Sequence, residues 1–215
     1  MKTALLLIDI QNDFCTGGAL AVKESETVIT VANKAIELCQ QHDQQHKMTI
    51  IASQDWHPAD HGSFAVNSGQ SAGELGELNG IPQVWWPVHC VQGQVGAEFH
   101  PALNQAAIRE VFRKGENPQV DSYSAFFDND HKNATRLHHW LSEQQINRLL
   151  ILGIATDYCV KFTVLDALEH GYETYVIPEG CRGVNIHPED SQKALAEMAD
   201  KGAKLISLSE MTSLF

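Results

Sequence analysis

Short apolar runs alternate with segments of helical periodicity along most of this chain. The runs lie at residues 4–9, 48–53, 108–113, 148–154, 173–178 and 203–209. An apolar run followed by a helical segment, repeated several times, is typical of parallel strands joined by crossover helices. The pattern predicts an α/β protein with three layers, in which helices cover both faces of an open sheet of six parallel strands.

Four helices are expected between these strands. The first follows Ser25, which can cap a first turn, and its apolar residues recur at helical spacing as far as Cys39. A second includes residues 137–141, a third follows Cys159 and stops at Gly171, and a fourth begins after Pro188 and ends at Gly202.

Residues 54–106 depart from the repeat. They hold seven of the fifteen glycines, four of the seven prolines and three of the four tryptophans. Compact domains seldom contain so long an irregular connection unless it has a function, and its aromatic residues argue against disorder. We therefore expect a single domain over residues 1–215, with a long functional loop at about 54–106.

Charge and cysteine usage exclude several classes of protein. The formal net charge is −12 without a Lys/Arg cluster, so neither nucleic acid nor an anionic membrane is an expected partner. No stretch approaches the roughly 18 apolar residues of a membrane span. The five cysteines are an odd number without a CxxC pair, which argues against a disulfide framework. We expect a soluble, cytoplasmic protein.

Chemically active side chains follow four of the predicted strands. Asp9 ends the first, Asp55 and His57 follow the second, Lys114 follows the third and Cys159 the fourth. Ligands of parallel sheets bind beyond the carboxyl ends of the strands, so these side chains are expected to meet. A thiolate attacks carbonyl groups and needs a base to take its proton, so this set suits a covalent hydrolase.

The segment "GIATDYCV" places Cys159 where a strand turns into a helix. If Thr156 or Asp157 caps the helix, the thiol lies in the first turn, where free N–H groups lower its pKa and can hold an oxyanion. Packing is the competing explanation for any buried cysteine. Cys15 and Cys181 also follow strands but open no helical pattern.

The long loop contains a candidate metal site. Asp55 and His57 stand two residues apart in expected extended chain, so both side chains project to the same side. His89 is a third candidate, and this set suits zinc, with iron or manganese as alternatives. His61 is a candidate for a fourth ligand or for a partner that orients the others. A solvated side chain is the competing explanation for any single loop histidine.

Four aromatic residues could form a slot near the strand ends. Phe14, Trp86, Tyr123 and Phe126 lie beside these strands or in loops that could reach them. A flat apolar slot would accept a small planar ring. Core packing is the competing explanation for each residue, and most strongly for Phe126 with its neighbour Phe127.

Six segments together resemble bacterial nicotinamidases, which belong to the isochorismatase-like superfamily of cysteine hydrolases. They are "IDIQNDFC", "SQDWHP", "WPVHC", "FRKGENP", "DSYSAFFD" and "GIATDYCV", in the family's order and over nearly the whole chain. The resemblance implies a Rossmann-like six-stranded parallel sheet. It also implies hydrolysis of nicotinamide to nicotinate and ammonia in NAD salvage, with pyrazinamide as a further substrate.

The resemblance also implies roles for single residues. Cys159 is the implied nucleophile, Asp9 its base and Lys114 the cation that orients both. One divalent metal ion, zinc before iron or manganese, would hold the pyridine nitrogen of the substrate. Other implied features are the metal ligands Asp55, His57 and His89, a cis Ile154–Ala155 peptide, an oxyanion hole from the Ala155 and Cys159 amides, and ring contacts from Phe14, Trp86 and Tyr123.

Some questions stay open at this level. Members of the family differ at the positions of His61 and Tyr158, so neither residue inherits a role. Another cysteine amidohydrolase or an isochorismatase of the same superfamily is an alternative function, and a metal-binding redox sensor whose Cys159 is reversibly oxidised is a more distant one. Both a monomer and a homodimer are compatible with the sequence.

Overall fold

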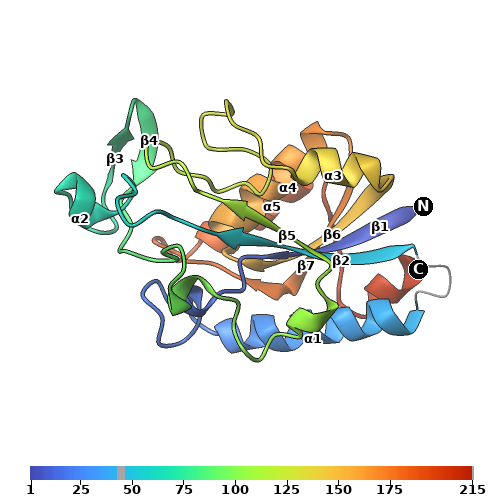
Figure 1. The fold of residues 1–215 in the computed structure, drawn as a ribbon. Coiled ribbons are helices and arrows are strands. Elements are labelled where there is room, and N and C mark those ends of the chain that lie inside the picture. Colours follow the sequence, from blue (N-terminus) through green and yellow to red (C-terminus); the bar gives the residue numbers. More distant parts are fainter. Residues whose placement is uncertain (43–46, 215) are drawn as a thin grey trace.

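A six-stranded parallel sheet forms the centre of the protein (Figure 1). The computed structural model describes residues 1–42 and 47–214. Every strand pair in the sheet is parallel, and the order is β5-β2-β1-β6-β7-β8, which confirms the predicted fold class. The strands are β1 (Lys2–Ile8), β2 (Met48–Asp55), β5 (Glu110–Lys114), β6 (Ile146–Ile154), β7 (Glu173–Arg182) and β8 (Lys204–Leu205).

Helices cover both faces of the sheet (Figure 1). Helix α1 (Ser25–His42) packs on one face, and α3 (Leu137–Glu143) and α4 (Lys161–Glu169) lie on the other, with α5 (Asp190–Asp200) beside α4. Residues 3–8 of β1 are all buried, so this strand runs through the middle of the core. Among the described residues, no helix is both long and apolar enough to cross a bilayer.

The last predicted strand is wrong in its extent. An apolar run at 203–209 predicts a full strand, but β8 contains only Lys204 and Leu205. The chain turns at Ser207, whose backbone N–H donates to Glu210 Oε2 at 2.7 Å, and the 3₁₀ helix η5 (Glu210–Leu214) follows. A serine side chain that bonds the nearby backbone competes with strand pairing, and Ser207 Oγ accepts the Glu210 N–H at 3.2 Å.

The long connection is more regular than expected. It contains the short helix α2 (Ala65–Ser68) and an antiparallel hairpin of β3 (Leu75–Leu78) and β4 (Ile81–Val84). At the turn, Asn79 and Gly80 have φ values of 51° and 78°, as a two-residue turn of type I′ requires. The Asn-Gly pair therefore indicated this hairpin in the sequence. The remaining 3₁₀ segments are η1 (Asn12–Phe14), η2 (Val95–Ala97) and η3 (Gln105–Ala107).

Close packing of β1 against β6 leads to a first prediction. Gly153 has a φ of 141°, and a Cβ there would collide with the backbone oxygen of Ile8 on the paired strand. We expect Gly153→Ala to lower the free energy of unfolding by about 3–5 kcal/mol, because backbone strain and overpacking add. Urea denaturation followed by circular dichroism measures this loss.

Gly17→Ala is the matched control. Its φ is 89°, but nothing lies within 4 Å of the added Cβ, so only the strain of about 1–2 kcal/mol should remain. Equal losses for the two variants would contradict the proposed clash between the strands.

Candidate active site and metal centre

Four neighbouring strands deliver the predicted catalytic residues to one edge of the sheet. In the order of the sheet these strands are β5, β2, β1 and β6. Lys114 and Asp55 are the last residues of β5 and β2, not residues that follow the strands as predicted, and Asp9 comes directly after β1. Cys159 lies in the helical turn that follows β6. The predicted convergence of these side chains is therefore present.

The Lys114 ammonium lies at the centre of this group. Its side chain is fully buried, and a buried charge is tolerated only when it is paired and hydrogen-bonded. Contacts from four separate segments satisfy it. They are Asp9 Oδ2 at 3.0 Å, Asp55 Oδ1 at 2.9 Å, the Ser122 carbonyl oxygen at 2.8 Å and Cys159 Sγ at 3.3 Å.

The Asp9 carboxyl connects the thiol to the rest of the group. Oδ1 accepts a hydrogen bond from Ser53 Oγ at 2.6 Å, and the Cys159 side chain lies beside the same carboxylate. Burial raises the pKa of Asp9, and the neighbouring Lys114 charge only partly offsets the increase. Burial alone would lower the pKa of Lys114, but Asp55 and Asp9 raise it well above its ordinary value, so the amine stays charged.

The expected low thiol pKa is wrong for this site. Burial raises the pKa of the Cys159 thiol well above its ordinary value; Lys114 lowers it, and the Asp9 and Asp55 charges raise it further. The resting side chain is therefore a thiol, and it needs a base within reach to become a nucleophile. Asp9 occupies that position.

A π-helical turn, η4 (Thr156–Val160), carries Cys159 into α4. Ala155 occupies the N-cap position, so the predicted cap at Thr156 or Asp157 is wrong. The Asp157 carboxylate instead accepts hydrogen bonds from the N–H groups of Val184 at 2.9 Å and Asn185 at 2.7 Å. The peptide between Ile154 and Ala155 is cis, as the resemblance implied.

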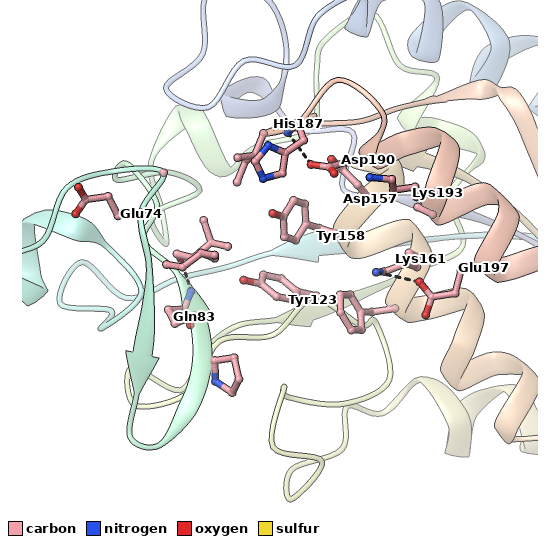
Figure 2. A pocket seen from close by; sticks show the side chains of 17 residues that line it. Glu74, Gln83, Tyr123, Asp157, Tyr158, Lys161, His187, Asp190, Lys193 and Glu197 are labelled. Atoms are coloured by element: carbon pink, nitrogen blue, oxygen red, sulfur yellow. Dashed lines mark hydrogen bonds and ion pairs between the residues drawn. The ribbon is translucent and has the colours of Figure 1, made fainter.

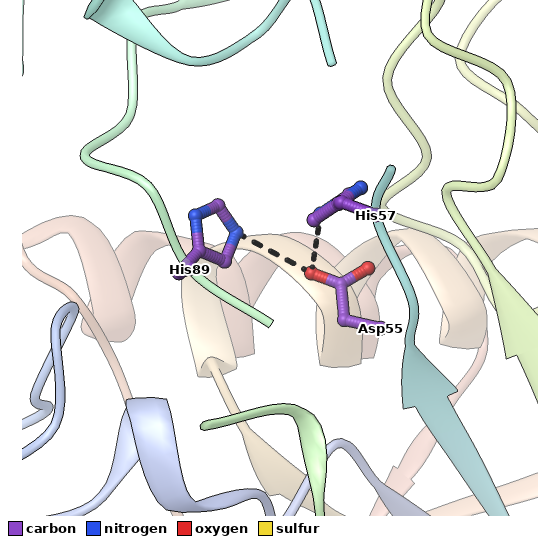
Figure 3. A group of neighbouring side chains, drawn as sticks. All are labelled: Asp55, His57 and His89. Carbon is purple, nitrogen blue, oxygen red and sulfur yellow. Dashed lines mark hydrogen bonds and ion pairs between the residues drawn. The ribbon is translucent and has the colours of Figure 1, made fainter. Parts of the chain in front are cut away.

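Three predicted metal ligands converge beside the catalytic group (Figure 3). Asp55 Oδ2 lies 3.0 Å from Nε2 of His57 and 3.5 Å from Nε2 of His89. The other ring nitrogen of each histidine faces a backbone carbonyl at 2.8 Å, that of Gly115 for His57 and of Pro87 for His89. Because a carbonyl accepts only, both Nδ1 atoms carry hydrogen, and whenever one of these rings is neutral its Nε2 lone pair points toward Asp55.

Three hydrogen-bond acceptors that lie this close together form a suitable site for a cation. Two imidazole lone pairs and a carboxylate oxygen repel one another unless a proton or a metal ion lies among them. Burial lowers the pKa of His57, but the Asp55 charge and hydrogen bond outweigh this and raise it, because a proton can take the cation's place. Asp55 keeps its charge, since His57 and Lys114 hold its pKa well below the ordinary value despite burial.

His61 also fits a metal site. Its Nδ1 lies 2.7 Å from Ser63 Oγ, and its Nε2 is buried without a hydrogen-bond partner among the described residues. The His61 and His57 rings lie 4.4 Å apart. Burial, reinforced by the His57 charge, lowers the pKa of His61 to about 4, so its ring is neutral. The Ser63 N–H donates to Nδ1 at 3.1 Å, so Nε2 offers a lone pair to an ion only when the ring hydrogen moves to Nδ1, which then donates to Ser63 Oγ. The orphaned nitrogen is an observation that an ion would explain.

A small chamber above Cys159 has aromatic walls. Phe14, Trp86 and Tyr123 all line it, as predicted for the substrate slot, together with the half-buried Tyr158. The Trp86 ring meets Tyr158 edge-on, at 5.0 Å between centroids and 87° between planes. Phe126 was a further candidate but packs in the core against His170 and Tyr172. The remaining lining residues are Leu20, Asp55, His89, Asp121, Ala155, Cys159 and Val184.

An outer groove of about 910 Å³ adjoins this chamber (Figure 2). The β3–β4 hairpin forms one side of the groove and residues of α4 and α5 the other. Tyr123 and Tyr158 line both spaces, so these two side chains stand at the boundary between groove and chamber.

Residue-by-residue reasoning overlooked three polar side chains. Gln11 is fully buried and continues the link between β1 and β2: its amide donates to the Asp55 carbonyl and accepts from the Asp55 N–H, both at 2.8 Å. Asp13 Oδ2 accepts from the Cys90 N–H at 2.7 Å, next to His89. Asp121 lines the chamber. All three belong to the quoted segments "IDIQNDFC" and "DSYSAFFD", whose polar residues were the available signal.

Comparison with known proteins gives consistent matches. Residues 3–210 match the isochorismatase domain. The nicotinamidase of Escherichia coli (strain K12) is 56% identical over 207 residues, covering 96% of this chain and 95% of that protein. A nicotinamidase/pyrazinamidase structure from Acinetobacter baumanii has a TM-score of 0.90 at 38% identity, with 98% of each chain covered. Pyrococcus horikoshii pyrazinamidase, solved in complex with zinc, has a TM-score of 0.77 at 35% identity, covering 96% of this chain and 99% of that one.

The network around Lys114 makes a stability prediction. Replacing Lys114 with Met leaves the Asp9 and Asp55 carboxylates buried without their ammonium, which typically costs about 3–5 kcal/mol. We expect this loss in the free energy of unfolding at pH 7, measured by urea denaturation in the presence of a chelator.

Lys161→Met is the control. Its ammonium pairs with Glu197 at 3.3 Å near the surface, so its loss should cost less than about 1 kcal/mol. If Lys114→Met were as stable as this control, the buried network would not need the ammonium.

Proposed function

The chain belongs to the isochorismatase family, and we propose that within this family it is a nicotinamidase, which hydrolyses nicotinamide to nicotinate and ammonia. The observation that carries the proposal is the contact of the Cys159 thiol with both the Asp9 carboxylate and the Lys114 ammonium, directly beside the cation site. Full-length similarity to proteins named nicotinamidase supports the choice of substrate.

The first chemical step forms a thioester. Asp9 takes the proton of the Cys159 thiol, and the thiolate attacks the carboxamide carbon of the substrate. Lys114 touches both partners, so its charge stabilises the thiolate as it forms and keeps Asp9 oriented toward it. Backbone N–H groups of Ala155 and Cys159, at the start of η4, would hold the oxyanion of the tetrahedral intermediate.

The second half of the reaction releases both products. Asp9 returns its proton to the leaving nitrogen, so that ammonia departs as the C–N bond breaks. A water molecule then gives its proton to Asp9 and attacks the thioester carbon, which releases nicotinate and restores the Cys159 thiol. One carboxyl group thus acts alternately as base and acid.

One divalent ion would be held by Asp55, His57 and His89. His61 would be a fourth ligand through Nε2, which has no partner among the described residues. Zinc is our first choice, since two imidazoles and a carboxylate suit it, and a pyrazinamidase of the same fold is a zinc complex. When bound, the ion supplies a positive charge that can hold the ring nitrogen of the substrate. Iron and manganese remain alternatives with the same ligand set.

The aromatic walls suit a flat heteroaromatic amide. Phe14, Trp86 and Tyr123 would pack on a six-membered ring, with the carboxamide directed to Cys159. Pyrazinamide has the same shape and is our second proposed substrate, supported by relatives that carry both activities in their names. All five cysteines are buried and none forms a disulfide in the described part of the chain, which fits a reducing compartment, so we place this step of NAD salvage in the cytoplasm.

Ammonia release from nicotinamide tests the proposed roles. We expect Cys159→Ala to lose essentially all turnover, because the variant lacks the sulfur that attacks the carboxamide, and Asp9→Asn to lose about 10²–10⁴-fold while remaining folded. An enzyme-coupled ammonia assay measures kcat, and circular dichroism checks the fold.

Cys181→Ala provides the matched control, since Cys181 is equally buried at a strand end but lies on β7 outside the chamber. Turnover that survives in Cys159→Ala at the level of this control would exclude Cys159 as the nucleophile.

A further inference from the structure

A third buried carboxylate, Asp121, faces the proposed metal site. It lies in the connection between β5 and α3, is only 3% exposed and lines the chamber. One of its oxygen atoms lies within 4.8 Å of ring nitrogens of both His57 and His61. The mechanism above gives this carboxylate no task.

Two fixed donors hold Asp121 in place. Oδ1 accepts the Ser122 N–H at 2.8 Å, and Oδ2 accepts the Gln83 side-chain N–H at 2.8 Å. Gln83 is itself buried on β4, and its amide also donates to the Val84 carbonyl at 2.6 Å. An ionised carboxylate offers about four acceptor positions, so these bonds leave part of its capacity unused.

His61 supplies independent evidence for a cation at this place. Its side chain is fully buried, and Nε2 has no hydrogen-bond partner among the described residues. Ser63 occupies the other ring nitrogen. A buried nitrogen without a partner is unfavourable, and an ion bound to Nε2, with the ring hydrogen on Nδ1 donated to Ser63 Oγ, would remove this cost.

The charges in the site lead to the same conclusion. Asp9, Asp55 and Asp121 are three buried carboxylates, and Lys114 pairs with the first two. Within residues 1–42 and 47–214, no Lys or Arg side chain forms an ion pair with Asp121. With Lys114 charged, two negative charges remain when all three carboxylates are ionised and the histidines of the site are neutral. One divalent ion balances them, and without Asp121 the same ion would leave an excess positive charge in a buried place.

One ion accounts for both groups of potential ligands. The first group consists of Asp55, His57 and His89, and the second of His57, His61 and Asp121. His57 belongs to both groups. His57 Nδ1 is bonded to the Gly115 carbonyl, so only Nε2 can face a metal. A single imidazole nitrogen binds one ion at a time, which argues against two separate metal sites.

We propose that Asp121 is a positioning residue of the metal site: its carboxylate balances the second charge of the divalent ion and fixes the ion on the side of His61. This inference rests on the metal site of the proposed function. It assigns to Asp121 a contribution to ion affinity that neither Asp9 nor Asp55 can replace, because Lys114 already neutralises part of their charge.

Zinc affinity of Asp121→Asn tests the proposal. The metal-free protein is titrated with Zn²⁺ against a chromophoric chelator, which gives the Kd and the number of ions per chain. We expect one ion per chain for the wild type and a Kd that is about 10–100-fold weaker in Asp121→Asn, the usual effect of losing a group that supports metal ligands. An unchanged Kd in the variant overturns the proposal, and so do two ions per wild-type chain.

Asp128→Asn is the matched control. Asp128 is a buried carboxylate of the same connection, its Oδ2 accepts from Asn133, and it belongs to neither group of potential ligands. We expect its Zn²⁺ affinity to equal that of the wild type. An equal loss of affinity in both variants would mean that any buried carboxylate of this segment has the same effect, which contradicts a specific role of Asp121.

Thermal unfolding separates positioning from a structural role. Asp121→Asn removes one of three buried negative charges, so the metal-free variant should melt at or above the Tm of the metal-free wild type, while its rise in Tm on Zn²⁺ addition should shrink. A merely structural Asp121 would give a lower Tm or an unfolded chain without metal, and either result overturns the proposal.

Failure of the proposed function is visible separately. Wild-type protein that binds one Zn²⁺ but releases no ammonia from nicotinamide refutes the nicotinamidase assignment, while the comparison of Kd values still decides the role of Asp121. Wild-type protein that binds no Zn²⁺ refutes the metal site and this inference together.

Discussion

The fully buried Lys114 ammonium is the constraint on which the rest of the site depends. An isolated charge cannot stay in a protein interior, so groups from four segments must meet around it. Those groups include the Asp9 carboxylate and the Cys159 sulfur, which are the base and the nucleophile that amide hydrolysis needs. Stability and chemistry thus require the same arrangement, and neither can change without the other.

The order of the strands explains how distant residues reach this cation. Strands β5, β2, β1 and β6 lie side by side and point the same way, so their carboxyl ends form one continuous edge. Beyond that edge, Gln11 continues the pairing of β1 with β2, and Asp13 holds the loop that carries His89. The metal ligands are therefore fixed to the same frame as the thiol, and Asp55 belongs to both groups.

Periodicity predicted the sheet because buried parallel strands leave long apolar runs, and the strand ends then indicated Asp9, Asp55, Lys114 and Cys159. Periodicity gave the wrong length for β8, because polar contacts of Ser207 end that strand early. The hairpin was predictable from its Asn-Gly turn. The raised thiol pKa and Asp121 were not, because both follow from burial and from long-range neighbours, which a local pattern does not contain.

The most direct measurement of the central claim is the identity of the residue that becomes acylated. Wild-type protein is mixed with nicotinamide, quenched in acid within the first turnovers, digested and analysed by mass spectrometry. We expect a nicotinoyl thioester on the peptide that contains Cys159. A nicotinoyl group on another of the five cysteines, or active protein whose Cys159 is never modified, would contradict it.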